Sequence, residues 1–307
     1  MQMSAIDTSE EVIDGFTVTA KRKTVWRKEL ALVEEFVRIC DKYELQYFIS
    51  GGTLLGAVRH KGFIPWDDDI DIMMSRNDYE TFIAVAQSEL KQGYNLQHYT
   101  TEKNYDCGHI QLRDDSTTAL LAADYSNLKC NKNLGIFIDI FPFDNIPDDD
   151  RKAISFTKKI KFKKRVIRSK IHGHYRGVKG FFKRLYFAIF ARDSEKAIAD
   201  VDKKSQKYNG KTHRIALTTF MPGYTRNMWA EAWFSEIIKL PFEHLMLSAP
   251  KYFDEVLRTE YGDYMQMPKD IPHTMHGSCY FDTENSYTDY VNISKERFDE
   301  LFEEMIL

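Results

Sequence analysis

Two neighbouring stretches decide the fold of this chain: Tyr47-Phe48-Ile49-Ser50-Gly51-Gly52-Thr53-Leu54-Leu55-Gly56 and Ile64-Pro65-Trp66-Asp67-Asp68-Asp69-Ile70-Asp71-Ile72. In the first, a short apolar run enters a glycine pair, which predicts a strand, a turn and a short helix. In the second, four carboxylates lie within five residues, next to the apolar residues of an expected buried strand. Backbone N–H groups at a glycine turn bind phosphate oxygens, and clustered carboxylates bind hard cations. Together the two stretches predict a metal–phosphate site.

The spacing of the acids indicates which of them share a face. In a strand, residues i and i+2 point the same way, so Asp67, Asp69 and Asp71 are expected on one side and Asp68 on the other. Like charges on one face repel each other unless a cation lies among them. Oxygen ligands at this spacing suit Mg²⁺ or Mn²⁺. We therefore expect Asp69 and Asp71 to bind the metal, with Asp67 as an additional ligand and Asp68 facing away.

A further carboxylate lies inside the apolar run Gly135-Ile136-Phe137-Ile138-Asp139-Ile140-Phe141. The length and β-branched content of this run predict a buried central strand, which Pro142 and Pro147 are expected to end. A buried carboxylate is costly unless it is paired or bound to a metal. Asp139 is therefore predicted to join the acids of the earlier stretch.

These three features together resemble the nucleotidyltransferase fold associated with polymerase β. The run from Gly52 to Asp71 resembles, more narrowly, the signature of the LicD family. That family includes bacterial phosphocholine transferases and is similar to the fukutin-type ribitol-phosphate transferases. Ile138–Pro142, Tyr261–Met265 and Pro268 also match its pattern, and the resemblance spans roughly residues 27–276. It implies an α/β (α+β) fold, in which a mixed sheet is flanked by helices.

The resemblance also implies an activity: transfer of phosphocholine or a related phospho-alcohol from a CDP-linked donor to a glycan hydroxyl. The glycan would be a cell-surface precursor, as in lipopolysaccharide, capsule or teichoic acid. Phosphoryl transfer needs mainly positioning and charge neutralisation, which metal ions held by carboxylates and backbone amides supply. Nothing in the sequence selects choline over ethanolamine, glycerol, ribitol or a phospho-sugar.

Each expected site residue has a role in this mechanism. Asp69, Asp71 and Asp139 hold the metal, with help from Asp67. Gly51, Gly52 and Thr53 bind a phosphate, while Arg59 or Lys61 neutralises the departing nucleotide and Arg113 binds donor phosphate. Either Asp139 or His109 is the general base. Among the aromatic residues, Trp66 is the one expected to face a quaternary ammonium group.

The charge of the chain is unevenly distributed. The net charge is −3, yet residues 151–192 contain fifteen Lys and Arg and no Asp or Glu. We expect residues 23–148 to form the catalytic core, 149–192 a basic helical insertion of two helices, and 193–307 the C-terminal part that completes the same domain. Apolar residues among the bases leave two interpretations open: a solvated helical face, or a surface that contacts an anionic membrane. No stacking-and-groove motif predicts nucleic-acid binding.

Composition places the chain among soluble globular proteins, with 29% charged and 43% hydrophobic residues. The four cysteines form no CxxC pair and no secretory signal is visible, so we expect a cytoplasmic protein, peripheral to the inner membrane face if the basic segment docks there. Two alternatives remain at this stage. One is nucleotidyl transfer to a protein or small molecule, and the other is a non-catalytic glycan- or lipid-binding module on the same fold.

Overall fold

The eleven-residue strand β8 (Ile136–Ile146) is the central element of the computed structural model. The structure describes residues 6–122, 124–128, 132–172, 182, 187, 193–219, 225–268 and 279–303. Ile136, Ile138 and Ile140 are completely buried, as the apolar run predicts. The strand continues past Pro142 and ends at Ile146, directly before Pro147, so only the second of the two expected prolines marks its end. On one side of β8, the pairing with β6 (Ile110–Asp114) stops at Ile140 and the pairing with β9 (Arg214–Ala216) begins at Asp144. The missing N–H of Pro142 therefore lies where the ladder on that side is interrupted.

A mixed seven-stranded sheet is built around β8. Strand β4 pairs with β8 in parallel, while β6 and β9 pair with it antiparallel along different parts of its length. The full order is β10-β9-β8-β4-β3, with β5 added through β6. Besides β8, the strands of this sheet are β3 (Phe48–Ile49), β4 (Asp71–Ser75), β5 (Tyr94–Gln97), β6 (Ile110–Asp114), β9 (Arg214–Ala216) and β10 (Met228–Ala230). The prediction of a mixed α/β fold is therefore confirmed.

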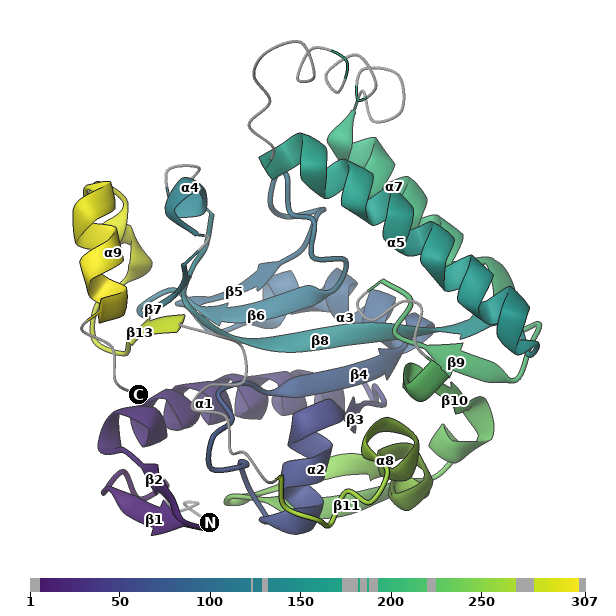
Figure 1. The fold of residues 1–307 in the computed structure, drawn as a ribbon, viewed down its shortest axis with the longest axis horizontal. Coiled ribbons are helices and arrows are strands. Elements are labelled where there is room, and N and C mark those ends of the chain that lie inside the picture. The colour runs from purple at the N-terminus through teal and green to yellow at the C-terminus, as the bar shows by residue number, and fades with distance from the viewer. Residues whose placement is uncertain are drawn as a thin grey trace.

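Three small antiparallel pairs complete the β-structure (Figure 1). They are β1 (Glu11–Ile13) with β2 (Phe16–Val18), β11 (Ile237–Phe242) with β12 (Leu245–Pro250), and β7 (Thr118–Leu121) with β13 (Cys279–Asp282). The last pair joins segments about 160 residues apart, so the end of the described chain packs against its first half.

The α-helices of the described residues are α1 (Ala20–Lys42), α2 (Gly51–Arg59), α3 (Arg76–Glu89), α4 (Tyr125–Leu128), α5 (Asp150–His172), α7 (Ser194–Ser205), α8 (Phe253–Tyr261) and α9 (Lys295–Glu303). Short 3₁₀ turns are η1 (Gln206–Tyr208), η2 (Thr225–Asn227), η3 (Glu231–Phe234) and η4 (Tyr287–Tyr290). Helices α1 and α3 contact each other and the central strands. Trp26, Leu30, Val33 and Phe36 of α1 enter the main hydrophobic core, where apolar burial contributes roughly 1.5–3 kcal/mol per large side chain.

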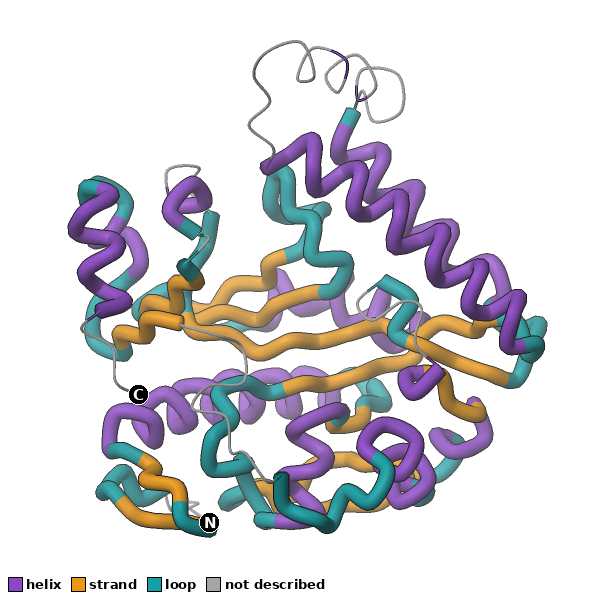
Figure 2. Tube along the Cα trace, viewed as in Figure 1, coloured by secondary structure: helices purple, strands orange, loops and turns teal. Residues whose placement is uncertain are grey.

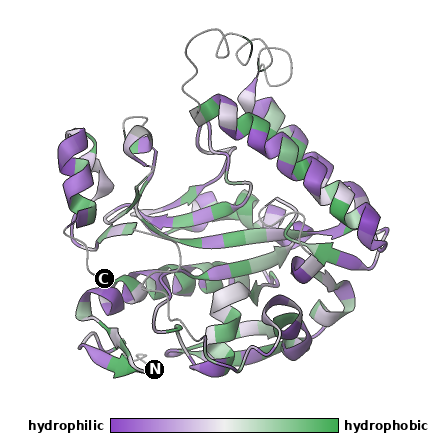
Figure 3. Ribbon diagram, in the orientation of Figure 1, coloured by the Kyte–Doolittle hydropathy of each residue, from purple (hydrophilic) through white to green (hydrophobic). Residues whose placement is uncertain are grey.

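The first part of the basic segment forms α5, which lies beside α7 and projects from the end of β8 (Figure 1). Hydrophobic and hydrophilic residues alternate along α5, whereas β4 and β8 are largely hydrophobic (Figure 3). The second expected basic helix falls outside the described residues. No helix among the described residues is long and apolar enough to cross a membrane.

Candidate metal–phosphate site

The glycine pair forms the first turn of α2. The helix begins at Gly51, so the N–H groups of its first residues have no helical carbonyl to bind and point outward, as a phosphate site requires. Gly51 has φ of +53°, which favours glycine. A Cβ atom on Gly51 would lie 3.0 Å from Oδ2 of Asp71, and one on Gly52 would overlap Oδ2 of Asp67. The two carboxylates therefore lie directly against the N-terminus of α2.

The acids Asp67–Asp69 lie in a loop and not in a strand, because β4 begins only at Asp71 (Figure 2). The alternation argument fails for this reason, and the expectation that Asp68 faces away is wrong. Oxygen atoms of Asp67, Asp68 and Asp69 all lie within 4.8 Å of one another. The loop folds all three carboxylates into one cluster.

Side chains of helix α1 bind the backbone of this loop. Arg22 Nη1 and Trp26 Nε1 both donate hydrogen bonds to the backbone carbonyl of Asp67, at 2.9 and 3.0 Å. Glu29, on the same helix, is 1% exposed, and burial together with the nearby charges of Asp69, Asp68 and Asp67 raises its pKa well above the usual range. A protonated Glu29 adds no further repulsion to the cluster. None of these three residues had a predicted role in the site, and the only sequence signal of Arg22 and Glu29 was their polarity on an apolar helix face.

Asp71 and Asp139 lie opposite each other in the parallel ladder of β4 and β8. Paired residues in adjacent strands are about 4.8 Å apart and project to the same face. The Thr53 hydroxyl accepts a hydrogen bond from the Asp71 backbone N–H at 2.8 Å, and Thr53 is 3% exposed. Thr53 therefore connects α2 to the start of β4 and sets the position of Asp71.

The Asp139 carboxylate is oriented by β6. Its Oδ1 atom lies 3.0 Å from His109 Nε2 and accepts a hydrogen bond from Gln111 Nε2 at 2.7 Å. Burial opposes ionisation, but attraction to His109 and these hydrogen bonds outweigh it, so the pKa of Asp139 lies below its usual value. His109 and Asp139, the two alternatives for the general base, are thus in direct contact.

Arg113 influences the hydrogen bonds of Asp139 indirectly, through Gln111. Its three guanidinium nitrogens donate to Gln97 Oε1, the Gly135 carbonyl and Gln111 Oε1, each at 2.6 Å. The side chain is 6% exposed and stacks over the ring of Phe137. Arg113 therefore positions Gln111 for Asp139. Sequence reasoning named Arg113 but missed Gln111, which shares the i+2 face of His109 and Arg113.

The remaining expected residues lie around the far end of α2. Arg59 is half-buried, with Nη1 3.3 Å from the Tyr264 carbonyl and its guanidinium over the Trp66 ring. Trp66 is 3% exposed and packs edge-on against Phe16, so its ring is closed to solvent. Lys61 is exposed and donates to the Val58 carbonyl, at the far end of α2 from the glycine pair.

Tyr261 belongs to the site although the sequence analysis gave it no role. Its hydroxyl lies 3.9 Å from the position of a Gly51 Cβ, next to the Asp71 carboxylate. Burial raises the pKa of Tyr261, and Glu260, Asp71, Asp67 and Asp69 raise it further. The phenol therefore remains a hydrogen-bond donor at neutral pH. Helix α8 brings it there by packing on α2, a contact that no local pattern reveals.

The donor set fits a hard divalent cation. Asp67, Asp69, Asp71 and Asp139 offer oxygen ligands only, as Mg²⁺ and Mn²⁺ prefer. Two of them, Asp67 and Asp71, lie against the N-terminus of α2, where backbone N–H groups favour an anion. The arrangement defines a class of site in which acidic side chains lie beside the N–H groups at the start of a helix.

Comparison of the sequence with known proteins shows which family of proteins this site resembles. Residues 44–179 match the family model described as "LicD/FKTN/FKRP, nucleotidyltransferase domain". The chain is 28% identical over 264 residues to the lipopolysaccharide cholinephosphotransferase LicD of Haemophilus influenzae, covering 80% of this chain and 92% of that protein. It is 23% identical over 107 residues to the ribitol 5-phosphate transferase FKRP of Mus musculus, covering 35% of this chain and 18% of that protein.

The chain therefore contains a LicD-family domain, as its sequence predicts. This domain holds the glycine pair, the acidic loop, and the strands of Asp71 and Asp139.

Proposed function

We propose that this protein transfers phosphocholine or a related phospho-alcohol from a CDP-linked donor to a hydroxyl of a cell-surface glycan precursor. The observation that carries the proposal is the contact of the Asp67 and Asp71 carboxylates with the glycine pair that begins α2. The similarity to the H. influenzae enzyme along most of both chains supports phosphocholine and a lipopolysaccharide acceptor as the first pair to test.

In this mechanism the acceptor oxygen forms a bond to the phosphorus of the donor, and the phosphorus–oxygen bond to CMP breaks. Asp69, Asp71 and Asp139, with Asp67, would hold Mg²⁺ or Mn²⁺, which would supply positive charge to the reacting phosphate. The first N–H groups of α2 bind a phosphate oxygen of the donor. The contacting pair of His109 and Asp139 accepts the proton that the acceptor hydroxyl loses.

The neighbours of the site have supporting roles. The Tyr261 hydroxyl donates a hydrogen bond to the donor phosphate beside Asp71, and Gln111 holds Asp139 in place. Because lipid-linked glycans are built at membranes, we place the protein in the cytoplasm at the inner membrane face.

A donor screen tests the proposal directly. We expect one of CDP-choline, CDP-ethanolamine, CDP-glycerol and CDP-ribitol, with Mg²⁺, to raise the melting temperature and to release CMP when acceptor is added. Pyrophosphate released from a nucleoside triphosphate, without CMP from any donor, would instead establish nucleotidyl transfer. Glycan or lipid binding without either product would establish a non-catalytic module.

The glycine pair gives a second prediction, for Gly52→Ala. The added Cβ displaces the Asp67 carboxylate, and a misplacement of about 1 Å at such a site costs on the order of a hundredfold in rate. Stability should not fall, since alanine favours a helix over glycine by about 1 kcal/mol. CMP release and thermal melting measure the two effects.

A double variant isolates the cause. If the clash with Asp67 is responsible, Gly52→Ala adds little to the loss already produced by Asp67→Ala. Full additivity of the two losses would show that Gly52 acts in another way.

A further inference from the structure

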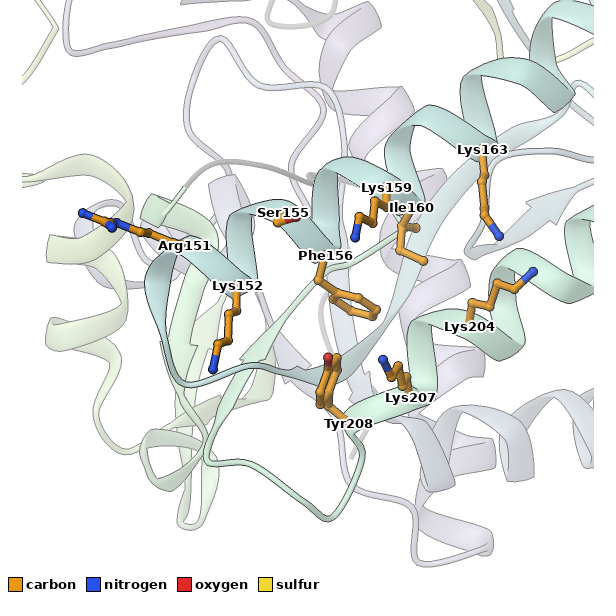
Figure 4. A pocket seen from close by; sticks show the side chains of 10 residues that line it. All are labelled: Arg151, Lys152, Ser155, Phe156, Lys159, Ile160, Lys163, Lys204, Lys207 and Tyr208. Atoms are coloured by element: carbon orange, nitrogen blue, oxygen red, sulfur yellow. The ribbon is translucent and has the colours of Figure 1, made fainter.

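A groove lined with cations runs between α5 and the α7–η1 segment (Figure 4). Its volume is about 540 Å³, and six bases line it: Arg151, Lys152, Lys159, Lys163, Lys204 and Lys207. No carboxylate is among its lining residues. The groove belongs to α5 and α7, and none of the acids of the metal–phosphate site lines it.

The positive charge of the groove is poorly balanced by protein. Within the described part of the chain, no carboxylate lies within ion-pair distance of Lys152, Lys159 or Lys207. Asp200 forms ion pairs with two lysines: a direct one with Lys204 and a longer one with Lys163, at 3.9 Å. The adjacent Lys204 ammonium lowers the pKa of Lys163. Bases gathered in this way are stabilised by an external anion.

The floor of the groove is apolar. Phe156 packs edge-on against Tyr208 with ring centroids 5.0 Å apart, and Ile160 lies beside them. A second hollow of about 640 Å³ continues along α5 and reaches Phe162, which is 58% exposed. A third, of about 380 Å³, continues between α5 and α7. A cationic rim over an apolar floor fits an amphiphile, with an anionic head and a hydrocarbon body.

We propose that the α5–α7 groove binds anionic membrane lipids, with the lipid phosphate among Lys159, Lys163 and Lys207 and an acyl chain along Phe156 and Phe162. The 23-residue α5 is about 35 Å long and carries bases along its length, which suits a membrane surface better than one free phosphate ion. Nucleic acid is less suited, because Phe156 and Tyr208 pack edge-on against each other and present no open pair of rings for bases to stack on.

Vesicle co-sedimentation of the full chain tests the proposal. We expect binding to vesicles that contain phosphatidylglycerol, weak binding to pure phosphatidylcholine, and weakening by salt. The charge reversal Lys159→Glu/Lys207→Glu should weaken binding about tenfold or more, because each base near an anionic surface contributes substantially. Both lysines are exposed and have no carboxylate partner among the described residues, so folding should be retained.

A matched control is Lys21→Glu/Arg27→Glu, which makes the same charge change at exposed positions of α1, away from the groove in Figure 1. This variant should bind vesicles nearly as well as the parent chain. Phe162→Ser leaves the charge unchanged and should still weaken binding severalfold, because an exposed apolar anchor is lost.

Several results would overturn the proposal. Equal losses in the groove and α1 variants would show a diffuse charge effect, and an unaffected Phe162→Ser would show that no apolar insertion occurs. Competition by inorganic phosphate or by single-stranded RNA as effective as competition by anionic vesicles would assign the groove to those ligands. The assay contains no CDP-linked donor, so its result is independent of the transfer reaction.

Discussion

Replacing Asp71 with asparagine should abolish transfer while leaving the fold intact. The substitution keeps the size of the side chain and removes a charge that lies against the N-terminus of α2 and opposite Asp139 in the ladder. A metal ion held by carboxylates stabilises charge in phosphoryl transfer by several kcal/mol, and each 1.4 kcal/mol is about tenfold in rate. We therefore expect CMP release to fall by on the order of a thousandfold or more.

The control for this variant is Asp41→Asn, at an exposed position near the end of α1. It should leave CMP release unchanged. A readout besides turnover is the rise in melting temperature that Mg²⁺ produces, which Asp71→Asn should reduce and Asp41→Asn should retain. Metal-dependent turnover at the parent rate in Asp71→Asn would refute the assignment of the metal site.

Replacing Arg76 with methionine should produce the largest loss of stability. Arg76 begins α3 and binds the Asp144 carboxylate of β8 through two nitrogens, at 2.6 and 2.9 Å, with a further ion pair to Asp202 of α7 at 2.9 Å. The Asp144 side chain is completely buried. Removing one partner of such a pair leaves an uncompensated charge and costs about 3–5 kcal/mol. Urea unfolding measures the loss.

Arg258→Met provides the comparison, since Arg258 pairs with Asp254 on the exposed surface of α8. That loss should be below about 1 kcal/mol. The double variant Arg76→Met/Asp144→Asn should recover part of the stability, because the buried charge is then gone. A loss from Arg76→Met as small as that from Arg258→Met would show that the buried network contributes little.

Much of the site was predictable because its residues are close together in sequence. The glycine pair, the acidic stretch and the apolar strand with one carboxylate each carry a local physical signal, and they indicated the family as well. The same locality explains the errors. The expectation for Asp68 depended on a strand through Asp67–Asp69, and Pro142 was read without knowing which side of β8 lacks a partner.

Other residues of the site had no local signal. Tyr261 approaches Asp71 only because α8 packs on α2, and Gln111 reaches Asp139 only because β6 lies beside β8 in that register. Arg113 looked like a phosphate ligand, yet its three guanidinium nitrogens bind protein oxygens at 2.6 Å. A side chain's type states what it can bind, and its neighbours decide what it does bind.

The sequence alone determined the mixed α/β class, the LicD-family domain, the metal-binding acids expected at the site and the basic character of α5. The first two follow from the resemblance that the residues from Gly52 to Asp71 carry, and the last two from short-range patterns of hydrophobicity and charge. Only the tertiary structure decided that the carboxylates lie against the N-terminus of α2, that α1 supports them from beneath, and that α5 and α7 enclose a groove. Those arrangements depend on contacts between residues far apart in the chain, so the packing of helices on the sheet had to be known.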